Sequence, residues 1–263
     1  MRNAVLGVYS YAAFGFCAVG FLPLLGAAQL LHGDDPTQRI PGRWMRRFGR
    51  TCVKLSPIWR FRIEGEPPAD VNERAFVVVA NHLSDADPFL LSFLPWDMRW
   101  IAKEELYRLP IIGNLMRYGG DIPIARKSRE GARIAMEEAR RSLDAGISIM
   151  MFPEGTRSKD GKLLPFKDGA FRLAVEAGVP VLPVAIAGTE ACRPKGSKWL
   201  REASAAARVL PPVETKGMTF DDVERLRDEV RARIEAAVSA MRGEAPRAEQ
   251  AEPSPASATI AAG

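Results

Sequence analysis

The sequence predicts an α/β fold: a mixed, largely parallel sheet flanked by helices and preceded by an N-terminal two-helix membrane-attachment unit. Three observations predict it. From residue 57 onward, short apolar runs alternate with amphipathic stretches of helical period, as strands and helices do in α/β chains. Residues 4–31 contain no charged residue, and residues 41–55 combine arginines with an apolar stripe. The 263 residues suffice for one sizeable domain with an appendage.

The first part, residues 1–56, opens with an apolar segment at 4–31 that is long enough for a membrane-spanning helix. Its glycines and Pro23 keep a second interpretation open, in which the segment dips into one leaflet, and a buried helix of a soluble protein is the third. The arginines that follow outnumber Arg2 in front of it. If the segment spans, the rest of the chain therefore faces the cytoplasm from the cytoplasmic membrane.

Residues 41–55 are expected to form a basic amphipathic helix. Trp44, Phe48 and Cys52 fall on one side at helical spacing, while arginines occupy much of the rest. Such a helix is suited to an anionic membrane surface. Its apolar side is equally suited to packing on the main domain.

The second part, residues 57–242, is the predicted catalytic domain and starts at the Ser56-Pro57 break. Alternating or continuous apolar runs indicate strands, Pro123 indicates an edge or irregular strand, and Gly146 ends a helix. We expect strands at residues 58–63, 75–80, 98–102, 121–125, 147–152, 179–186 and 208–213, and helices from Asp87 onward and at 128–145, 167–177 and 221–241. The third part, residues 243–263, is rich in Ala, Pro, Ser and Glu and is expected to be a disordered tail.

The net charge of +5 suits an anionic partner, such as phospholipid headgroups, a phosphorylated substrate or nucleic acid. Nucleic acid is not expected, because zinc-ligand spacing, a helix-turn-helix signature and aromatic RNA-binding motifs are missing from the sequence. The three cysteines, Cys17, Cys52 and Cys192, are isolated and odd in number. A disulfide framework is therefore not expected, which fits cytosolic exposure of the main domain.

The loop at residues 81–88 brings an imidazole, a hydroxyl and two carboxylates directly behind the buried run 75–80. In open α/β sheets, ligands bind in the crevice outside the strand ends. Asp87 before Pro88 and an apolar stretch is a helix-start signal, with the carboxylate at the N-cap. If the loop folds back, Asp87 can orient one nitrogen of His82 and leave the other as a base. In the alternative interpretation, Asp87 is a helix cap only.

Two further stretches carry charged residues at predicted strand ends. Arg126 follows the strand at 121–125, where its guanidinium could bind phosphate. Residues 152–158 form a turn after the strand at 147–152 and place Glu154 and Arg157 on its two sides. Proline and glycine explain the turn but not these charges.

Four stretches resemble the glycerolipid acyltransferases typified by bacterial 1-acylglycerol-3-phosphate acyltransferase. They are an Asn-His pair followed after four residues by Asp (81–87), a glycine, apolar strand and arginine (120–126), the sequence Phe-Pro-Glu-Gly-Thr-Arg-Ser (152–158), and an apolar segment built around proline (179–184). The third stretch matches in full and is the most distinctive. Their order and spacing identify the chain as a member of this family.

The resemblance implies acyl transfer from a thioester, acyl-CoA or acyl carrier protein, to the free hydroxyl of lysophosphatidic acid in membrane phospholipid synthesis. It implies that His82 is the general base and Asp87 its orienting carboxylate, with no metal and no cofactor. The residues that the resemblance assigns to acceptor binding are Arg126, Glu154, Gly155, Thr156, Arg157 and, as a further candidate, Lys103.

Three other functions stay open at this point. The acceptor could be another lysolipid, such as a lyso-ornithine lipid or a lysophospholipid in a remodelling cycle. A serine hydrolase using Ser84 is a second option, although the Gly-x-Ser-x-Gly elbow is missing from the sequence. A non-catalytic membrane lipid-binding protein is the third, and it would tolerate replacement of His82.

Overall fold

The computed structural model describes residues 2–158, 160–194 and 196–243. The tail predicted at 243–263 therefore lies, apart from Gly243, outside the described residues. The helices are α1 (Arg2–His32), α2 (Arg39–Leu55), α3 (Asp87–Leu91), α4 (Ile112–Tyr118), α5 (Arg129–Asp144), α6 (Gly169–Ala177) and α7 (Val223–Arg242). The strands are β1 (Trp59–Glu64), β2 (Val77–Ala80), β3 (Met98–Lys103), β4 (Ile122–Ile124), β5 (Ser148–Met151), β6 (Val181–Ala187) and β7 (Ala203–Val209). Short 3₁₀ turns are η1 (Glu104–Arg108), η2 (Thr189–Ala191) and η3 (Phe220–Asp222).

The strands form one sheet in the order β1-β7-β6-β2-β5-β3-β4. All neighbouring pairs are parallel except β6 and β7, which are antiparallel. The prediction of a mixed, largely parallel sheet is therefore confirmed. β4 is an edge strand, as Pro123 predicted, since proline cannot donate to a second neighbour. Because β2, β5 and β6 are adjacent and parallel, the loops after them meet at one edge.

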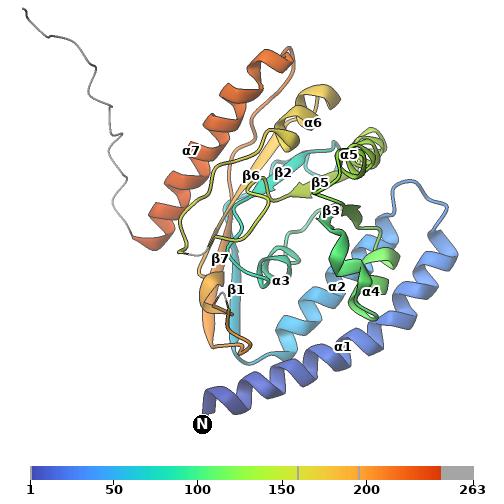
Figure 1. The fold of residues 1–263 in the computed structure, drawn as a ribbon, viewed down its shortest axis with the longest axis vertical. Coiled ribbons are helices and arrows are strands. Elements are labelled where there is room, and N and C mark those ends of the chain that lie inside the picture. The colour runs from blue at the N-terminus through green and yellow to red at the C-terminus, as the bar shows by residue number, and fades with distance from the viewer. Residues whose placement is uncertain (1, 159, 195, 244–263) are drawn as a thin grey trace, which may run out of the picture.

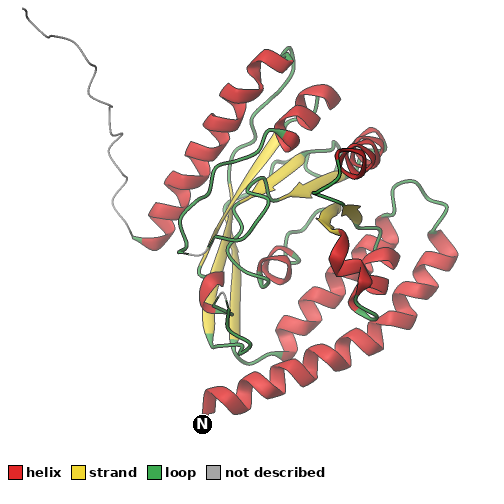
Figure 2. Ribbon diagram, viewed as in Figure 1, coloured by secondary structure: helices red, strands yellow, loops and turns green. Residues whose placement is uncertain are grey.

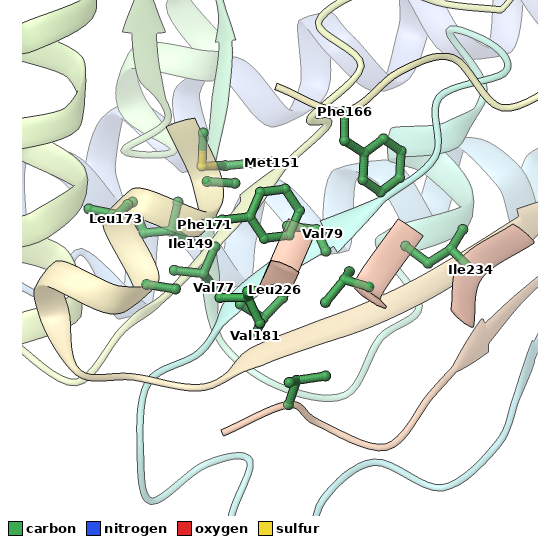
Figure 3. Packing of buried hydrophobic residues seen from close by; sticks show 14 of the residues in the cluster. Val77, Val79, Ile149, Met151, Phe166, Phe171, Leu173, Val181, Leu226 and Ile234 are labelled. Carbon is green, nitrogen blue, oxygen red and sulfur yellow. The ribbon is translucent and has the colours of Figure 1, made fainter. Parts of the chain in front are cut away.

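Helices cover both faces of the sheet (Figures 1 and 2). Residues Val77 and Val79 of β2 point to the face covered by α5, α6 and α7, where they pack with Phe171 and Leu226 (Figure 3). Phe76, Val78 and Ala80 point to the opposite face, which α3 covers. Successive side chains of a strand point to opposite faces of the sheet, so a strand that is buried on both faces has a continuous apolar sequence.

α1 and α2 lie side by side outside α3 and α4 (Figure 1). The apolar side of α2 is used inside the protein, because Phe48 and Cys52 pack against Cys17 and Leu25 of α1. The two expected settings for this side were the membrane surface and the main domain; the structure shows it packed on α1 and on Leu115 of α4 in the main domain. α1 is the one helix of the described chain that is long and apolar enough to cross a membrane, by length and composition alone.

Two local predictions differ from the structure. The last strand was expected at residues 208–213, but β7 spans Ala203–Val209. Alanine has low strand propensity, so the alanine-rich residues 203–207 carry no strand signal in the sequence. Their pairing with β1 and β6 decides that they form a strand. Asp87 is the first residue of α3 instead of its N-cap, and Ala86 precedes it without a side-chain cap.

Asn81 extends the contact between β2 and β6 beyond the end of β2. Its side-chain amide donates to the carbonyl of Ile186 (2.9 Å) and accepts from the N–H of Ile186 (2.7 Å). Asn81 is fully buried, so water cannot replace these bonds. The side chain thereby fixes where the chain leaves β2 and starts the loop that carries His82.

Replacing this amide should destabilise the fold. We expect Asn81→Ala to lower the free energy of unfolding by about 2–4 kcal/mol, because both backbone groups of Ile186 lose a buried partner. Urea denaturation in detergent solution, followed by tryptophan fluorescence, measures the change. Asn72→Ala is the matched control, since Asn72 is exposed, and equal stability of the two variants would contradict the prediction.

Candidate functional site

His82 and Asp87 meet at the edge of the sheet where β2 ends. His82 Nδ1 lies 2.7 Å from Asp87 Oδ2. The Asp87 side chain is fully buried, and 18% of the His82 side chain is exposed. A carboxylate oxygen accepts, so Nδ1 carries the proton and Nε2 keeps a free lone pair. The loop therefore folds back as the sequence interpretation required.

Asp87 holds more than the imidazole. Its Oδ2 also accepts from the backbone N–H groups of Leu83 (2.8 Å) and Ser84 (3.0 Å). The hydroxyl of Thr189, in the turn η2 that follows β6, donates to the other oxygen, Oδ1. These bonds satisfy a carboxylate that burial would otherwise make costly. Asp87 thus fixes its own loop, the imidazole and η2 in one arrangement.

The turn after β5 clamps the backbone of His82. The His82 N–H donates to Glu154 Oε1 (2.8 Å), and the His82 carbonyl accepts from the N–H of Ser158 (2.9 Å). The ring of Phe152 stacks on the imidazole, with centroids 4.1 Å apart and planes inclined by 17°. Position, tilt and tautomer of the imidazole are therefore all set by neighbouring groups.

Glu154 is buried and accepts a second backbone bond, from Leu164 N–H to Oε2 (3.2 Å). Burial raises the pKa of its carboxyl to about 7, and the two backbone N–H groups oppose that rise. Both oxygens of Glu154 are engaged by backbone. Through these two bonds, Glu154 positions His82 and the loop around residue 164.

Gly155, Thr156 and Arg157 complete this turn. Gly155 has φ +68°, a conformation that L side chains rarely adopt, which explains glycine at this position. Thr156 is exposed, and Arg157 is partly exposed. Arg157 Nη1 lies 2.8 Å from Asp85 Oδ2, on the same loop as His82.

Lys103 and Arg126 lie farther along the same edge of the sheet. Lys103 ends β3, which is two strands from β2, and Arg126 follows β4, which is three strands away. At about 4.8 Å per strand these separations are roughly 10 and 14 Å. Both side chains are exposed. The structure thus brings Glu154 and Arg157 next to His82 and places Lys103 and Arg126 along the edge.

Sequence reasoning missed Thr189 and the pairing role of Asn81. Thr189 is 102 positions from Asp87, so no local pattern connects the two. The glycine before it, Gly188 (φ +93°), marks a turn after a strand and was the available signal.

Ser84, considered above as a nucleophile, is fully buried, and its hydroxyl makes no hydrogen bond within residues 2–158, 160–194 and 196–243. The Nδ1 atom of His82 is hydrogen-bonded to Asp87. In that same part of the chain, no group of three or more His, Cys, Asp and Glu side chains could hold a metal ion.

This chain is similar in sequence and in structure to known proteins. A family model described as Acyltransferase matches residues 60–187. The crystal structure of the 1-acyl-sn-glycerophosphate acyltransferase PlsC from Thermotoga maritima is similar with a TM-score of 0.75 and 30% identity, and covers 94% of this chain and 98% of that one.

Among curated proteins, the 1-acyl-sn-glycerol-3-phosphate acyltransferase alpha of Homo sapiens is 40% identical over 158 residues, which are 59% of this chain and 56% of that protein. The chloroplastic 1-acyl-sn-glycerol-3-phosphate acyltransferase BAT2 of Brassica napus is 32% identical over 191 residues, 70% of this chain and 56% of that protein. The chain therefore spans little more than half the length of these curated relatives.

The bond from Thr189 to Asp87 gives a stability prediction. Thr189→Val removes a donor from a buried carboxylate without much change in shape, and should lower the free energy of unfolding by about 1–3 kcal/mol. Thr189→Ser keeps the hydroxyl, so its free energy of unfolding should fall less than that of Thr189→Val. Urea denaturation compares the two variants. An equal loss of unfolding free energy in both would show that the hydrogen bond from the Thr189 hydroxyl does not stabilise the fold.

Glu154 gives a prediction for pH dependence. A carboxyl whose pKa rises from 4.5 to about 7 on folding contributes stability that is present below pH 4.5 and lost as pH rises through about 7. At ~1.4 kcal/mol per pKa unit, the free energy of unfolding of the wild type relative to Glu154→Gln should fall by up to about 3 kcal/mol between about pH 5 and about pH 8. Denaturation at several pH values measures it.

The exposed Glu73 supplies the control, since Glu73→Gln should follow the wild type over the same range. A constant difference between wild type and Glu154→Gln would mean that Glu154 does not hold its proton more tightly in the folded protein.

Proposed function

The chain belongs to the acyltransferase family, and from that premise we propose that it is a 1-acyl-sn-glycerol-3-phosphate acyltransferase. It transfers an acyl group from a thioester donor, acyl-CoA or acyl carrier protein, to the sn-2 hydroxyl of lysophosphatidic acid and makes phosphatidic acid. The observation that carries the proposal is the His82–Asp87 pair, 2.7 Å apart, with the second imidazole nitrogen left as a base. The names of the relatives support the choice of acceptor.

His82 performs the proton transfer in this mechanism. An alcohol is a poor nucleophile at neutral pH, and histidine is the side chain whose ordinary pKa suits a base there. Nε2 takes the hydroxyl proton while the oxygen attacks the thioester carbonyl. The tetrahedral intermediate then expels the thiolate, which can take the proton back from His82. Asp87 stabilises the imidazolium and keeps Nδ1 protonated throughout.

The acceptor is held next to His82 by the residues of the same edge. Arg157 binds its phosphate, since a guanidinium matches phosphate oxygens with paired donors. Gly155 and Thr156 line the turn beside it, and Glu154 acts by positioning His82. Arg126 and Lys103 supply positive charge farther along the edge. Holding hydroxyl and thioester together contributes to rate beyond the proton transfer itself.

Residues 1–56 attach the protein to the membrane that contains the acceptor. Phe16 (78% exposed) and Leu30 (88% exposed) are among the apolar side chains that α1 leaves uncovered. The opposite side of α1 packs on the protein from Phe14 to Leu25, and Tyr11 Oη donates to the carbonyl of Lys198 (2.6 Å). Because α1 packs along the catalytic domain, insertion of α1 into one leaflet is favoured over a crossing of the bilayer. The catalytic domain then lies on the cytoplasmic side of the cytoplasmic membrane.

Another lysolipid acceptor is compatible with the same catalytic pair, because the base acts on a hydroxyl and not on the headgroup. A non-catalytic lipid-binding protein would not need the imidazole to be fixed in tautomer, tilt and position, as it is here. The buried hydroxyl of Ser84 disfavours a serine hydrolase.

Replacement of the base tests the proposal. With lysophosphatidic acid and acyl-CoA or acyl carrier protein donors in mixed micelles, we expect His82→Ala to lower kcat by about 10² to 10⁴-fold. We expect Asp87→Asn to lower it by on the order of 10²-fold or more, because an amide can turn its N–H toward Nδ1 and favour the wrong tautomer. His32→Ala, which replaces the other histidine of the chain, is the control. Unchanged product formation by His82→Ala would exclude the mechanism.

A further inference from the structure

Two arginines from different loops meet on one carboxylate beside the base. Arg157 Nη1 lies 2.8 Å from Asp85 Oδ2, and Arg193 Nη2 forms an ion pair with the same oxygen. Arg157 follows β5, Asp85 follows β2 and Arg193 follows β6, so three adjacent strands deliver them to one edge of the sheet. Arg193 belongs to none of the four stretches that resemble the acyltransferases.

The segment that carries Arg193 is tied down on both sides. Before it, Thr189 donates to Asp87, and Glu190 Oε1 pairs with Arg242 Nη2 of α7 (2.8 Å). After it, the N–H of Arg201 donates to the carbonyl of Cys192 (2.9 Å). Because Thr189 is bound to the orienting carboxylate itself, the backbone leading to Arg193 keeps a fixed relation to His82.

The charges at this point favour an additional anion. Two guanidiniums share one oxygen of a single carboxylate, so these three side chains together carry one net positive charge. All three side chains are partly open to solvent, with exposed fractions of 27% for Arg157, 32% for Arg193 and 48% for Asp85. Ion pairs this exposed contribute little to stability, so folding alone is a weak reason for the arrangement. Guanidinium groups that bind a carboxylate oxygen also fit phosphate oxygens, which carry more charge.

We propose that Arg193 is a second phosphate-binding arginine, which together with Arg157 binds the phosphate monoester of the acceptor lysolipid. Asp85 holds the two guanidiniums at this position while the acceptor is absent, and the phosphate takes over their donors when it binds. This inference rests on the proposed function. It adds a specificity-determining residue, since an acceptor without a phosphate monoester gains nothing from the second guanidinium.

Steady-state kinetics of the full chain in mixed micelles test the inference. We expect Arg193→Ala to raise KM for lysophosphatidic acid about tenfold, the usual scale for losing a charge-assisted hydrogen bond at a partly exposed site, with kcat changed less than about threefold. KM for the acyl donor should stay the same. Arg193→Lys, which keeps the charge but loses the paired donors, should fall between wild type and Arg193→Ala.

A second readout uses sn-glycerol 3-phosphate as a competitive inhibitor, because it carries the phosphate without an acyl chain. Its inhibition constant should rise in Arg193→Ala by the same factor as KM. Arg201→Ala is the matched control: Arg201 is an exposed arginine on the same segment and has no side-chain ion pair among residues 2–158, 160–194 and 196–243. It should behave as the wild type.

Two results would overturn the inference and leave the proposed function standing: an unchanged KM for lysophosphatidic acid in a folded Arg193→Ala protein, or a rise confined to KM for the donor. A wild-type protein that transfers no acyl group to lysophosphatidic acid would instead overturn the proposed function, and the inference with it.

Discussion

The arrangement of the site depends on one buried carboxylate that must be fully hydrogen-bonded. Asp87 has no exposed surface, so each of its oxygens needs a protein donor in place of water. The donors come from the imidazole, from two backbone N–H groups of its own loop, and from Thr189 after β6. The geometry that orients the His82 imidazole is therefore also the geometry that avoids an unsatisfied buried charge. Under the proposed mechanism, catalysis and folding constrain the same atoms.

The loops that follow β2, β5 and β6 act as one unit because they share these bonds. Asn81 links β2 to β6, Glu154 and Ser158 link the turn after β5 to His82, and Thr189 closes the set. Adjacent parallel strands are what make this possible, since their carboxyl ends lie within reach of one another. Glu154 adds a cost to the arrangement, because its own burial raises the pKa of its carboxyl to about 7.

Buried polar contacts also hold the N-terminal helices in place on the domain. Arg46 of α2 is buried and pairs with Asp97, and Arg50 donates to the carbonyl of Leu94 (3.0 Å). Some of the arginines that mark α2 as basic in the sequence are thus used to attach it to the segment between α3 and β3. With α1 packed on α2, the apolar surface of α1 has a fixed position relative to His82. Such a relation suits the proposed function, in which the acceptor comes from a bilayer.

The sequence alone determined the fold class, most of the elements and the pairing of His82 with Asp87, because apolar periodicity, proline and glycine act locally and these two residues lie in one loop. Only the tertiary structure decided that the alanines of β7 form a strand, that Asn81 and Thr189 serve the site, and that the apolar side of α2 faces α1. These outcomes depend on contacts between residues roughly 30 to 150 positions apart, such as the 102 between Asp87 and Thr189. A buried group takes its partner from whatever the packing of distant elements brings near it, and no local pattern records that choice.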